Sequence, residues 1–311
     1  MSRREPIFLE PVFREKIWGG DRLGTVFGYD IPSGRTGECW AISGHPGGDC
    51  RIKGRPGQTL GGLWREERAL FGGLEGDGFP LLVKLLDARE DLSIQVHPDD
   101  AYARVHENGA SGKTECWYIL DCKADASIII GHRARTAEEL REMVAENRWG
   151  ELLREVPVRP GDFFQIEPGC IHAIKGGTLL LETQQSSDVT YRFYDYGRLS
   201  GGKPRPLHIP ESLAVTRVPF RPRAVRPRSF REGDALVTEL IRCPCYTVYR
   251  AALDGRWARD WGDAPFVNMS VLDGQGTLDG IPVGRGDHLV LPAGYGTMAL
   301  AGRLELVCSH L

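Results

Sequence analysis

Pro160-Gly-Asp-Phe-Phe-Gln-Ile-Glu-Pro-Gly-Cys-Ile-His172 has a counterpart near the end of the chain, Arg285-Gly-Asp-His-Leu-Val-Leu-Pro-Ala-Gly-Tyr-Gly-Thr297. Each segment has a Gly-Asp turn, a short strand-forming run and a second turn that contains Gly. The positions that align without a gap are Gly161 with Gly286, Asp162 with Asp287, and Gly169 with Gly294. This internal repeat predicts two similar β units in tandem.

The repeated pattern resembles the second motif of the cupins, which are small jelly-roll barrels. In that motif the second turn leads to a metal-binding His. The first copy ends in His172 and the second in Thr297, so we expect metal in the first barrel alone. We therefore predict an all-β fold of two tandem cupin barrels. Residues 1–225 would form the metal-binding domain with a small helical elaboration, and residues 226–311 the metal-free domain.

The strand and helix signals fit this organisation. Strands are predicted over residues 81–86, 92–97, 115–120, 126–130, 163–166, 171–174, 178–183 and 189–194. The helical elaboration is predicted over residues 98–108 and, after a capping box at Thr136 and Glu139, over residues 137–154. Residues 197–232 hold much of the Pro and Arg and are the best candidate for a linker.

The composition is that of an ordinary globular protein. The 311 residues carry a formal net charge of −3, so the chain as a whole has no net positive charge to attract nucleic acid or anionic membranes. No apolar run is long enough for a membrane span, and the N-terminus lacks the apolar region of a signal peptide, so we expect a cytoplasmic protein. The eight Cys include no CxxC pair. We expect reduced, mostly buried thiols, with Cys243-Pro-Cys245 as the one candidate redox or metal-binding pair.

Four side chains form a candidate metal site. In the strand over residues 92–97 the side chains alternate, so Gln95 and His97 point to the face opposite Ile94 and Val96. Glu115 begins a later strand and His172 ends the cupin-like turn. Two imidazoles, a carboxylate and a carboxamide are a nitrogen and oxygen set that suits Zn²⁺.

The blocks around these residues resemble, in order and spacing, those of the type I mannose-6-phosphate isomerases, and the length is similar to that of the short bacterial branch. The four blocks are Leu92-Ser-Ile-Gln-Val-His-Pro-Asp-Asp-Ala-Tyr102, Gly112-Lys-Thr-Glu-Cys-Trp-Tyr118, Pro168-Gly-Cys-Ile-His-Ala-Ile174 and Gln184-Gln-Ser-Ser-Asp-Val-Thr-Tyr-Arg-Phe-Tyr-Asp195. The resemblance implies one Zn²⁺ per chain, held by Gln95, His97, Glu115 and His172. It also implies conversion of mannose 6-phosphate to fructose 6-phosphate and back.

Such an isomerisation moves a proton between C1 and C2 through a cis-enediol, and needs a base, an electrophile and a cationic phosphate site. The resemblance implies catalytic roles for Lys113 and Arg192, and substrate contacts from Lys84, Glu182 and Asp188. The base remains open among Lys113, a zinc-bound water and a carboxylate. The phosphate-binding residues are not identified by the sequence.

Three other functions compete with this interpretation. An Fe(II)-dependent oxygenase usually has an imidazole-and-carboxylate set, so Gln95 argues against it. A non-catalytic sugar-binding or regulatory cupin, or an isomerase of a related sugar phosphate, would keep the same pocket. In each sugar-phosphate case we expect a small-molecule partner, no nucleic acid, no membrane, and neither a nucleotide nor a redox cofactor. The sequence leaves the oligomeric state open.

Overall fold

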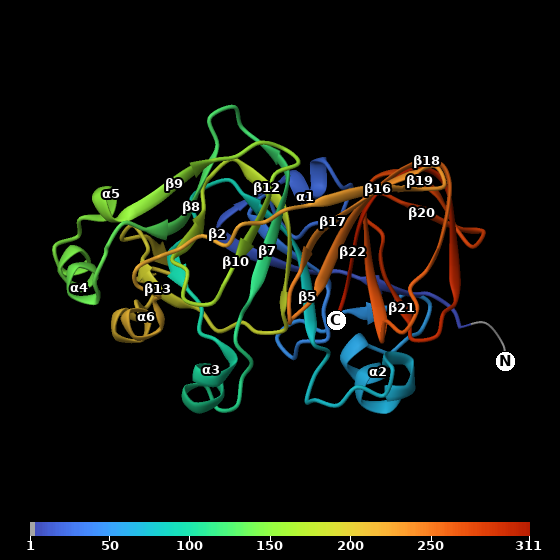
Figure 1. The fold of residues 1–311 in the computed structure, drawn as a ribbon, viewed down its shortest axis with the longest axis horizontal. Coiled ribbons are helices and arrows are strands. Elements are labelled where there is room, and N and C mark those ends of the chain that lie inside the picture. Colours follow the sequence, from blue (N-terminus) through green and yellow to red (C-terminus); the bar gives the residue numbers. More distant parts are fainter. Residues whose placement is uncertain (1–3) are drawn as a thin grey trace.

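A computed structural model describes residues 4–311 of the chain. It consists mainly of antiparallel strands arranged side by side as two β domains, which Figure 1 shows on the left and right of the molecule. The six α-helices and one 3-10 helix of the described residues are short and lie at the periphery, in keeping with a chain that has 39 Gly and 20 Pro. The all-β prediction is confirmed.

Two sheets form the first barrel. The six-stranded sheet has the order β10-β7-β12-β5-β2-β3, and the five-stranded sheet has the order β13-β6-β11-β8-β9. The six-stranded sheet comprises β2 (Val12–Gly20), β3 (Thr36–Ile42), β5 (Leu81–Ala88), β7 (Glu115–Cys122), β10 (Phe163–Ile166) and β12 (Thr178–Gln185). The five-stranded sheet comprises β6 (Ile94–Val96), β8 (Ser127–His132), β9 (Leu153–Pro157), β11 (His172–Ile174) and β13 (Tyr191–Tyr194).

The second barrel is a nine-stranded sheet that also takes in two strands from the start of the chain. It comprises β16 (Arg228–Glu232), β17 (Ala235–Arg242), β18 (Thr247–Asp260), β19 (Phe266–Leu278), β20 (Ile281–Gly284), β21 (His288–Pro292), β22 (Thr297–His310), β1 (Ile7–Glu10) and β4 (Arg51–Ile52). Strand β1 pairs with β21, so the N-terminal segment is part of the C-terminal sheet. The division of the chain after residue 225 stays a prediction.

The repeated Gly-Asp segments have the same local structure. Gly161 and Gly286 have φ values of 91° and 89°, a left-handed conformation that glycine adopts without a steric penalty. In each turn the Asp carboxylate accepts a hydrogen bond from a backbone N–H three residues earlier, at 2.8 Å for Asp162 and 2.9 Å for Asp287. The sequence repeat therefore marks equivalent turns, each of which leads into a barrel strand.

The helices are α1 (Arg22–Thr25), α2 (Leu60–Glu66), the 3-10 helix η1 (Arg68–Phe71), α3 (Asp100–His106), α4 (Ala137–Ala145), α5 (Trp149–Leu152) and α6 (Ile209–Val215). The single helix expected over residues 137–154 was wrong in extent. Asn147, in the left-handed conformation at φ 55°, follows the end of α4, and Leu153 already belongs to β9. The expected linker holds the small hairpin of β14 (Leu199–Ser200) and β15 (Lys203–Pro204), and also α6, which packs on the apolar cluster around β13.

The two barrels share one hydrophobic core. Along β5, Leu81, Val83 and Leu85 pack against residues of the C-terminal sheet, whereas Lys84 points into the first barrel. Four aromatic rings lie at this junction, and those of Phe79 and Phe266 are 4.7 Å apart. The strands that carry the polar interior are thus fixed from behind by apolar packing.

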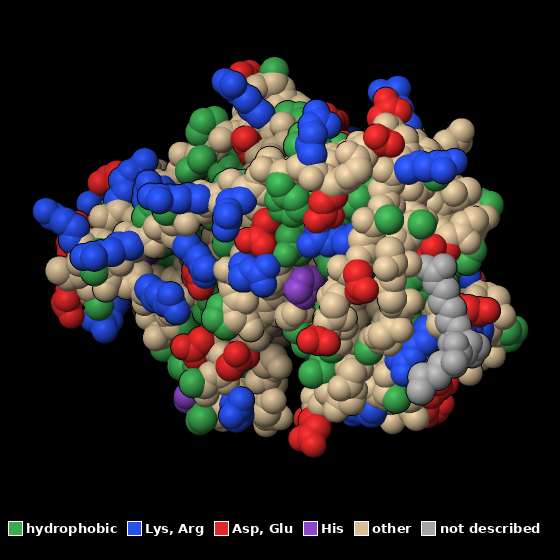
Figure 2. Space-filling view, turned by 45° about the vertical axis from the view of Figure 1, so that its right-hand side comes forward, with side chains coloured by type: hydrophobic (Ala, Val, Ile, Leu, Met, Phe, Trp, Pro, Cys, Tyr) green, Lys and Arg blue, Asp and Glu red, His purple; other side chains and the backbone are tan. Residues whose placement is uncertain are grey.

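The outer surface carries charges of both signs. Lys and Arg side chains are interspersed with Asp and Glu over the face seen in Figure 2, in keeping with the small net charge. Among the described residues, no helix has the length and apolar character that a membrane crossing requires.

Replacing Phe266 by Ala should lower the free energy of unfolding by about 3–5 kcal/mol, because it leaves a cavity where the two barrels join. The matched control is Phe230→Ala, at a position that is 37% exposed on the edge strand β16, where we expect a loss of no more than about 1 kcal/mol. Urea unfolding followed by fluorescence measures both. Equal losses of stability in the two variants would contradict a special role for Phe266 at the junction of the two barrels.

Candidate active site

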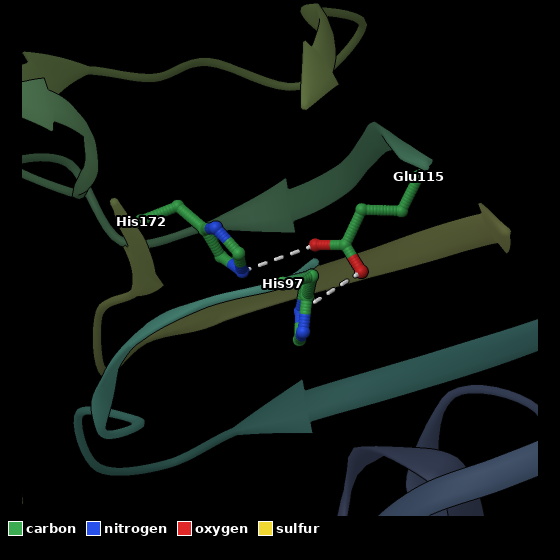
Figure 3. Close-up of side chains that lie close together, drawn as sticks. All are labelled: His97, Glu115 and His172. Atoms are coloured by element: carbon green, nitrogen blue, oxygen red, sulfur yellow. Dashed lines mark ion pairs between the residues drawn. The ribbon is translucent and has the colours of Figure 1, made fainter. Parts of the chain in front are cut away.

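A carboxylate lies between two imidazoles inside the first barrel (Figure 3). Glu115 Oε1 is 3.3 Å from His172 Nε2, and Glu115 Oε2 is 3.6 Å from His97 Nε2. These ligand atoms all lie within 4.8 Å of one another, and the three side chains are buried. Within residues 4–311 no other group of three or more His, Cys, Asp or Glu side chains meets this geometry. The structure therefore brings together residues that are up to 75 positions apart in the sequence.

Strand alternation explains why these side chains face inward. Along β7, Glu115 and Trp117 point into the first barrel, whereas Cys116 and Tyr118 pack into the core shared with the second barrel. Pairing of β11 with β6 places His172 opposite Gln95. A one-residue shift along β7 or β11 would turn these polar side chains toward the apolar layer.

The backbone fixes the orientation of both imidazoles. Nδ1 of His97 lies 2.8 Å from the carbonyl oxygen of Val189, and Nδ1 of His172 lies 2.9 Å from that of Cys170. Since a carbonyl only accepts, each Nδ1 carries the proton and donates it to that oxygen. Each Nε2 is then left with a lone pair directed at the common centre, as in His side chains that bind metals.

Gln95 and Glu115 complete a set of donors that a divalent cation would satisfy. The side-chain amide of Gln95 is 3.3 Å from His172 Nε2. Oε1 of Glu115 is buried and makes no hydrogen bond within the described part of the chain. A buried carboxylate oxygen without a hydrogen-bond partner is costly unless a cation or water compensates it. The residues present therefore fit a metal ion.

Lys113 joins this cluster to an open cavity. Its Nζ is 2.5 Å from Glu115 Oε2 and 3.2 Å from His97 Nε2. Lys113 and Gln95 also line a cavity of about 270 Å³. Its other charged lining residues are Lys16, Glu38, Lys84, Glu182, Asp188, Arg192 and Arg205. The three buried ligand side chains thus lie behind the wall of a cavity large enough for a small polar molecule.

The lysines of the cavity are matched by carboxylates. Lys84 forms a buried ion pair with Glu182 at 3.2 Å, and Trp117 Nε1 donates to the other oxygen of Glu182 at 3.1 Å. Lys16 pairs with Glu38 at 3.2 Å. These pairs satisfy charges that could not be buried alone.

The two arginines that line the cavity differ from the lysines. Arg192 forms no ion pair in the described residues, and its buried Nε lacks a hydrogen-bond partner. Arg205 donates from one edge of its guanidinium to both oxygens of Asp195, which also pairs with Arg198 at 2.6 Å. Burial, followed by the charge of Arg205, lowers the pKa of Arg192. Because Asp195 is shared by Arg205 and Arg198, and Arg192 has no ion-pair partner among the described residues, positive charge remains available for an anion.

Burial and charge shift the pKa values of the cluster in opposite directions. Burial raises the pKa of Glu115 to about 7, although Lys113 opposes the shift, and lowers that of His172 to about 4. The charges of Lys113 and Lys84 overcome burial at Glu182 and lower its pKa to about 2. At Lys113 itself, the carboxylates of Glu115 and Glu182 outweigh burial and raise the pKa. Burial also lowers the pKa of His97 well below its usual value, so both imidazoles are neutral at pH 7, while Lys113 is charged.

Most of the site residues expected from the sequence line one cavity or lie behind its wall. Asp188 is different, because its carboxylate is 67% exposed at the mouth, 3.8 Å from Nε2 of His45. The sequence analysis missed Arg205 as well as the pair of Lys16 and Glu38. Glu38 precedes Cys39 in a strand-like run, and an acidic residue in an otherwise apolar run could have indicated a side chain that faces a polar cavity. Nothing in the sequence around Arg205 indicated a site residue, because it lies in the segment that was expected to be a linker.

The folded state should lose protons from His172 before the unfolded state does as pH rises. The folded pKa of about 4 is below the unfolded value of 6.5, so stability is lost as pH falls from 6.5 to 4, by on the order of 3 kcal/mol. Glu115, with its raised pKa, acts in the opposite sense between pH 4.5 and 7. The His172→Asn variant lacks the contribution of His172 and keeps that of Glu115. In urea unfolding of the chelator-treated proteins, wild type should therefore lose more stability than the variant as the pH falls. If the free energies of unfolding of the two proteins changed in parallel with pH, this assignment would be wrong.

Comparison with known proteins identifies the family. Residues 7–115 match the catalytic domain of phosphomannose isomerase type I, and residues 237–311 match the cupin domain of mannose-6-phosphate isomerase. The chain is 50% identical to mannose-6-phosphate isomerase ManA of Bacillus subtilis and 45% identical to mannose-6-phosphate isomerase of Streptococcus mutans. These alignments cover 99% of both chains in the first case and 98% in the second.

The solved structures agree with this. The crystal structure of mannose 6-phosphate isomerase from Bacillus subtilis has a TM-score of 0.96 at 46% identity, covering 99% of this chain and 100% of that one. A phosphomannose isomerase from Salmonella typhimurium, at 17% identity and a TM-score of 0.80, shares the fold over 99% of each chain. The chain belongs to the type I phosphomannose isomerase family of enzymes.

Proposed function

We propose that this protein interconverts mannose 6-phosphate and fructose 6-phosphate by proton transfer through a cis-enediol, with one Zn²⁺ bound per chain. The observation that carries the proposal is the position of Lys113, which touches the buried cluster of His97, Glu115 and His172 and also lines the cavity. Family membership and the full-length similarity to enzymes named for this activity support the same reaction.

Gln95, His97, Glu115 and His172 would hold the metal ion. Rotation of the Gln95 carboxamide exchanges its nitrogen and oxygen, so its oxygen can occupy the position 3.3 Å from His172 Nε2. The two Nε2 lone pairs and the carboxylate supply the remaining ligands. A bound zinc ion would act as a Lewis acid toward the C1 and C2 oxygens of the sugar.

Lys113 is the candidate for moving the proton between C1 and C2. Its ammonium is held by Glu115 at 2.5 Å, and that contact keeps it protonated. With Glu115 engaged as a metal ligand, its charge would favour the ammonium less, and burial would then act to lower the pKa of Lys113 against the remaining charge of Glu182. A lysine in this position could accept a proton from one carbon and return it to the other on the same face of the enediol.

Arg192 and Arg205 are the candidates for binding the phosphate. Each lines the cavity, and they contribute the guanidinium groups that the lysine–carboxylate pairs do not neutralise. Asp195 would position Arg205 through two hydrogen bonds along one edge, which leaves its other nitrogen free to donate. Strand pairing sets Arg192 opposite Gln95, so the same guanidinium could reach an oxygen of the enediolate as well as the phosphate.

Lys84 and Glu182 would contact the sugar hydroxyls. Their ion pair is buried and is completed by Gln184, which accepts from Lys84 at 2.8 Å, and by Trp117. A fixed donor and a fixed acceptor side by side can recognise the configuration of a hydroxyl-bearing carbon. Asp188, at the mouth, would interact with the substrate as it enters.

Chelation should abolish isomerase activity, and added Zn²⁺ should restore it. Activity is followed by a coupled assay that measures fructose 6-phosphate formed from mannose 6-phosphate. His172→Ala and Glu115→Gln should retain less than about one tenth of the bound zinc of wild type, measured by elemental analysis after dialysis. His106→Ala, an exposed imidazole in α3, is the control and should keep both zinc and activity. Full activity in metal-free protein would reject zinc dependence.

Lys113 and Arg205 should affect different kinetic constants. Lys113→Ala should lower kcat by about 10²–10⁴-fold with zinc still bound, because it removes the proton-transfer group. Arg205→Ala should mainly raise KM for mannose 6-phosphate, and Asp195→Asn should do so more weakly because it only positions Arg205. Near-normal turnover of the zinc-loaded Lys113→Ala variant would assign the proton transfer to another group. An unchanged KM in Arg205→Ala would place the phosphate elsewhere.

A further inference from the structure

Two thiols meet in a turn that the proposed isomerase chemistry does not use. Cys243 and Cys245 flank Pro244 between the end of β17 and the start of β18. The N–H of Cys243 donates to the carbonyl oxygen of Tyr246 at 2.9 Å, which closes the turn. Both cysteine side chains are half-buried, Pro244 is exposed, and Cys245 lines a surface groove that also contains Asp188.

We propose that Cys243 and Cys245 form a reversible disulfide when a hydroperoxide oxidises the thiol of Cys243. One residue separates the two cysteines, and both side chains pack against the apolar core that the two barrels share, so both thiols lie on the same side of the turn. Residues separated by one position in a closed turn have Cα atoms within about 7 Å of each other, close to the span that a disulfide bridges. The proposal depends on neither the metal nor the substrate assigned above.

The surroundings give the two thiols different roles. The neighbouring Cys245 side chain lowers the pKa of Cys243 to about 7, and Cys243 in turn raises the pKa of Cys245. Arg223, whose Nη1 pairs with Glu167 at 2.6 Å, also lies beside this turn, with its Nη2 donating to the carbonyl oxygen of Arg242 at 3.4 Å. Cys243 is therefore the thiolate that reacts first, and Cys245 is the thiol that resolves the product.

The chemistry balances with hydrogen peroxide as the oxidant. The Cys243 thiolate attacks one peroxide oxygen, the O–O bond breaks, and the hydroxide that leaves takes up a proton to become water. The resulting sulfenic acid is attacked by the Cys245 sulfur. The S–O bond then breaks, the departing hydroxide takes the Cys245 proton, and the S–S bond forms. Two thiols lose two electrons in total, and the peroxide is reduced to two molecules of water.

The other cysteines do not offer this arrangement. Burial raises the pKa of the thiols of Cys39, Cys50, Cys116, Cys170 and Cys308. Cys122 is half-buried like the pair, but no second cysteine stands within five positions of it in the sequence. Its sulfur donates to the carbonyl oxygen of Val158, and burial raises its pKa. It is therefore a matched control for accessibility without a partner.

Cys245 also touches the residue that precedes strand β7, which carries the buried carboxylate. Cys245 Sγ lies 3.5 Å from Thr114 Oγ1 and donates to it. Thr114 stands between Lys113 and Glu115 in the sequence. Disulfide formation consumes the S–H that makes this contact, so oxidation would be sensed at the start of β7.

Trypsin places both thiols in one peptide, because it cleaves after Arg242 and Arg250. The intact protein is treated with hydrogen peroxide at neutral pH, blocked with N-ethylmaleimide, digested without reductant and analysed by mass spectrometry. We expect peptide 243–250 to be unlabelled and two hydrogens lighter, and to take up two labels after dithiothreitol. Cys122→Ser should behave like wild type, whereas Cys243→Ser and Cys245→Ser should form no disulfide in this peptide.

The rates provide a second test on the unmutated protein, which does not depend on how the variants fold. In wild type at pH 7, Cys243 should react with iodoacetamide at least about tenfold faster than Cys122, because a larger fraction of it is thiolate. The proposal is overturned if peptide 243–250 keeps two labelled thiols at peroxide doses that oxidise Cys122. It is equally overturned if the bridge found joins Cys243 or Cys245 to Cys116, or if Cys122 reacts as fast as Cys243.

Discussion

The burial of one carboxylate inside the first barrel is the constraint on which the surrounding structure depends. Glu115 is fully enclosed, with two imidazoles and one ammonium as its nearest polar neighbours. Removing one partner from a buried charge pair costs about 3–5 kcal/mol, so such a carboxylate persists only where several elements hold its partners in place. Here the partners come from the residue after β6, from the start of β11 and from the segment before β7.

The rigidity of those elements comes from the opposite faces of the same strands. Strands β5, β7 and β12 present Lys84, Glu115 and Glu182 to the interior, while their alternate residues lie in the apolar core shared with the second barrel. The second barrel has an interior filled with apolar side chains and, among the described residues, no metal-binding cluster of its own. Its contribution is to fix the back of the sheet that carries the polar cavity.

Much of this arrangement could be predicted from local patterns. The alternation over residues 92–97 placed Gln95 and His97 on one face, and the repeated pattern placed His172 directly after the cupin-like turn, where β11 begins. The parts that failed lacked a local signal. The helix over residues 137–154 is shorter because Asn147 adopts a left-handed conformation, and α6 was hidden in a segment rich in Pro and Arg. Arg205 reaches the cavity through its bonds to Asp195, a contact that no periodicity encodes.

By itself the sequence determined the all-β class and the tandem repeat, because each depends on residue type and on spacing within short segments. The four candidate ligands came from residue types together with the resemblance of their sequence blocks to a known family. Tertiary structure decided which charges are neutralised and which remain available, since ion pairs such as Lys84 with Glu182 join strands about 100 residues apart. It also decided that β1 completes the C-terminal sheet, and that Cys245 lies against Thr114. Contacts of this kind depend on how strands from distant parts of the chain are brought into register, and side-chain alternation alone does not specify that register.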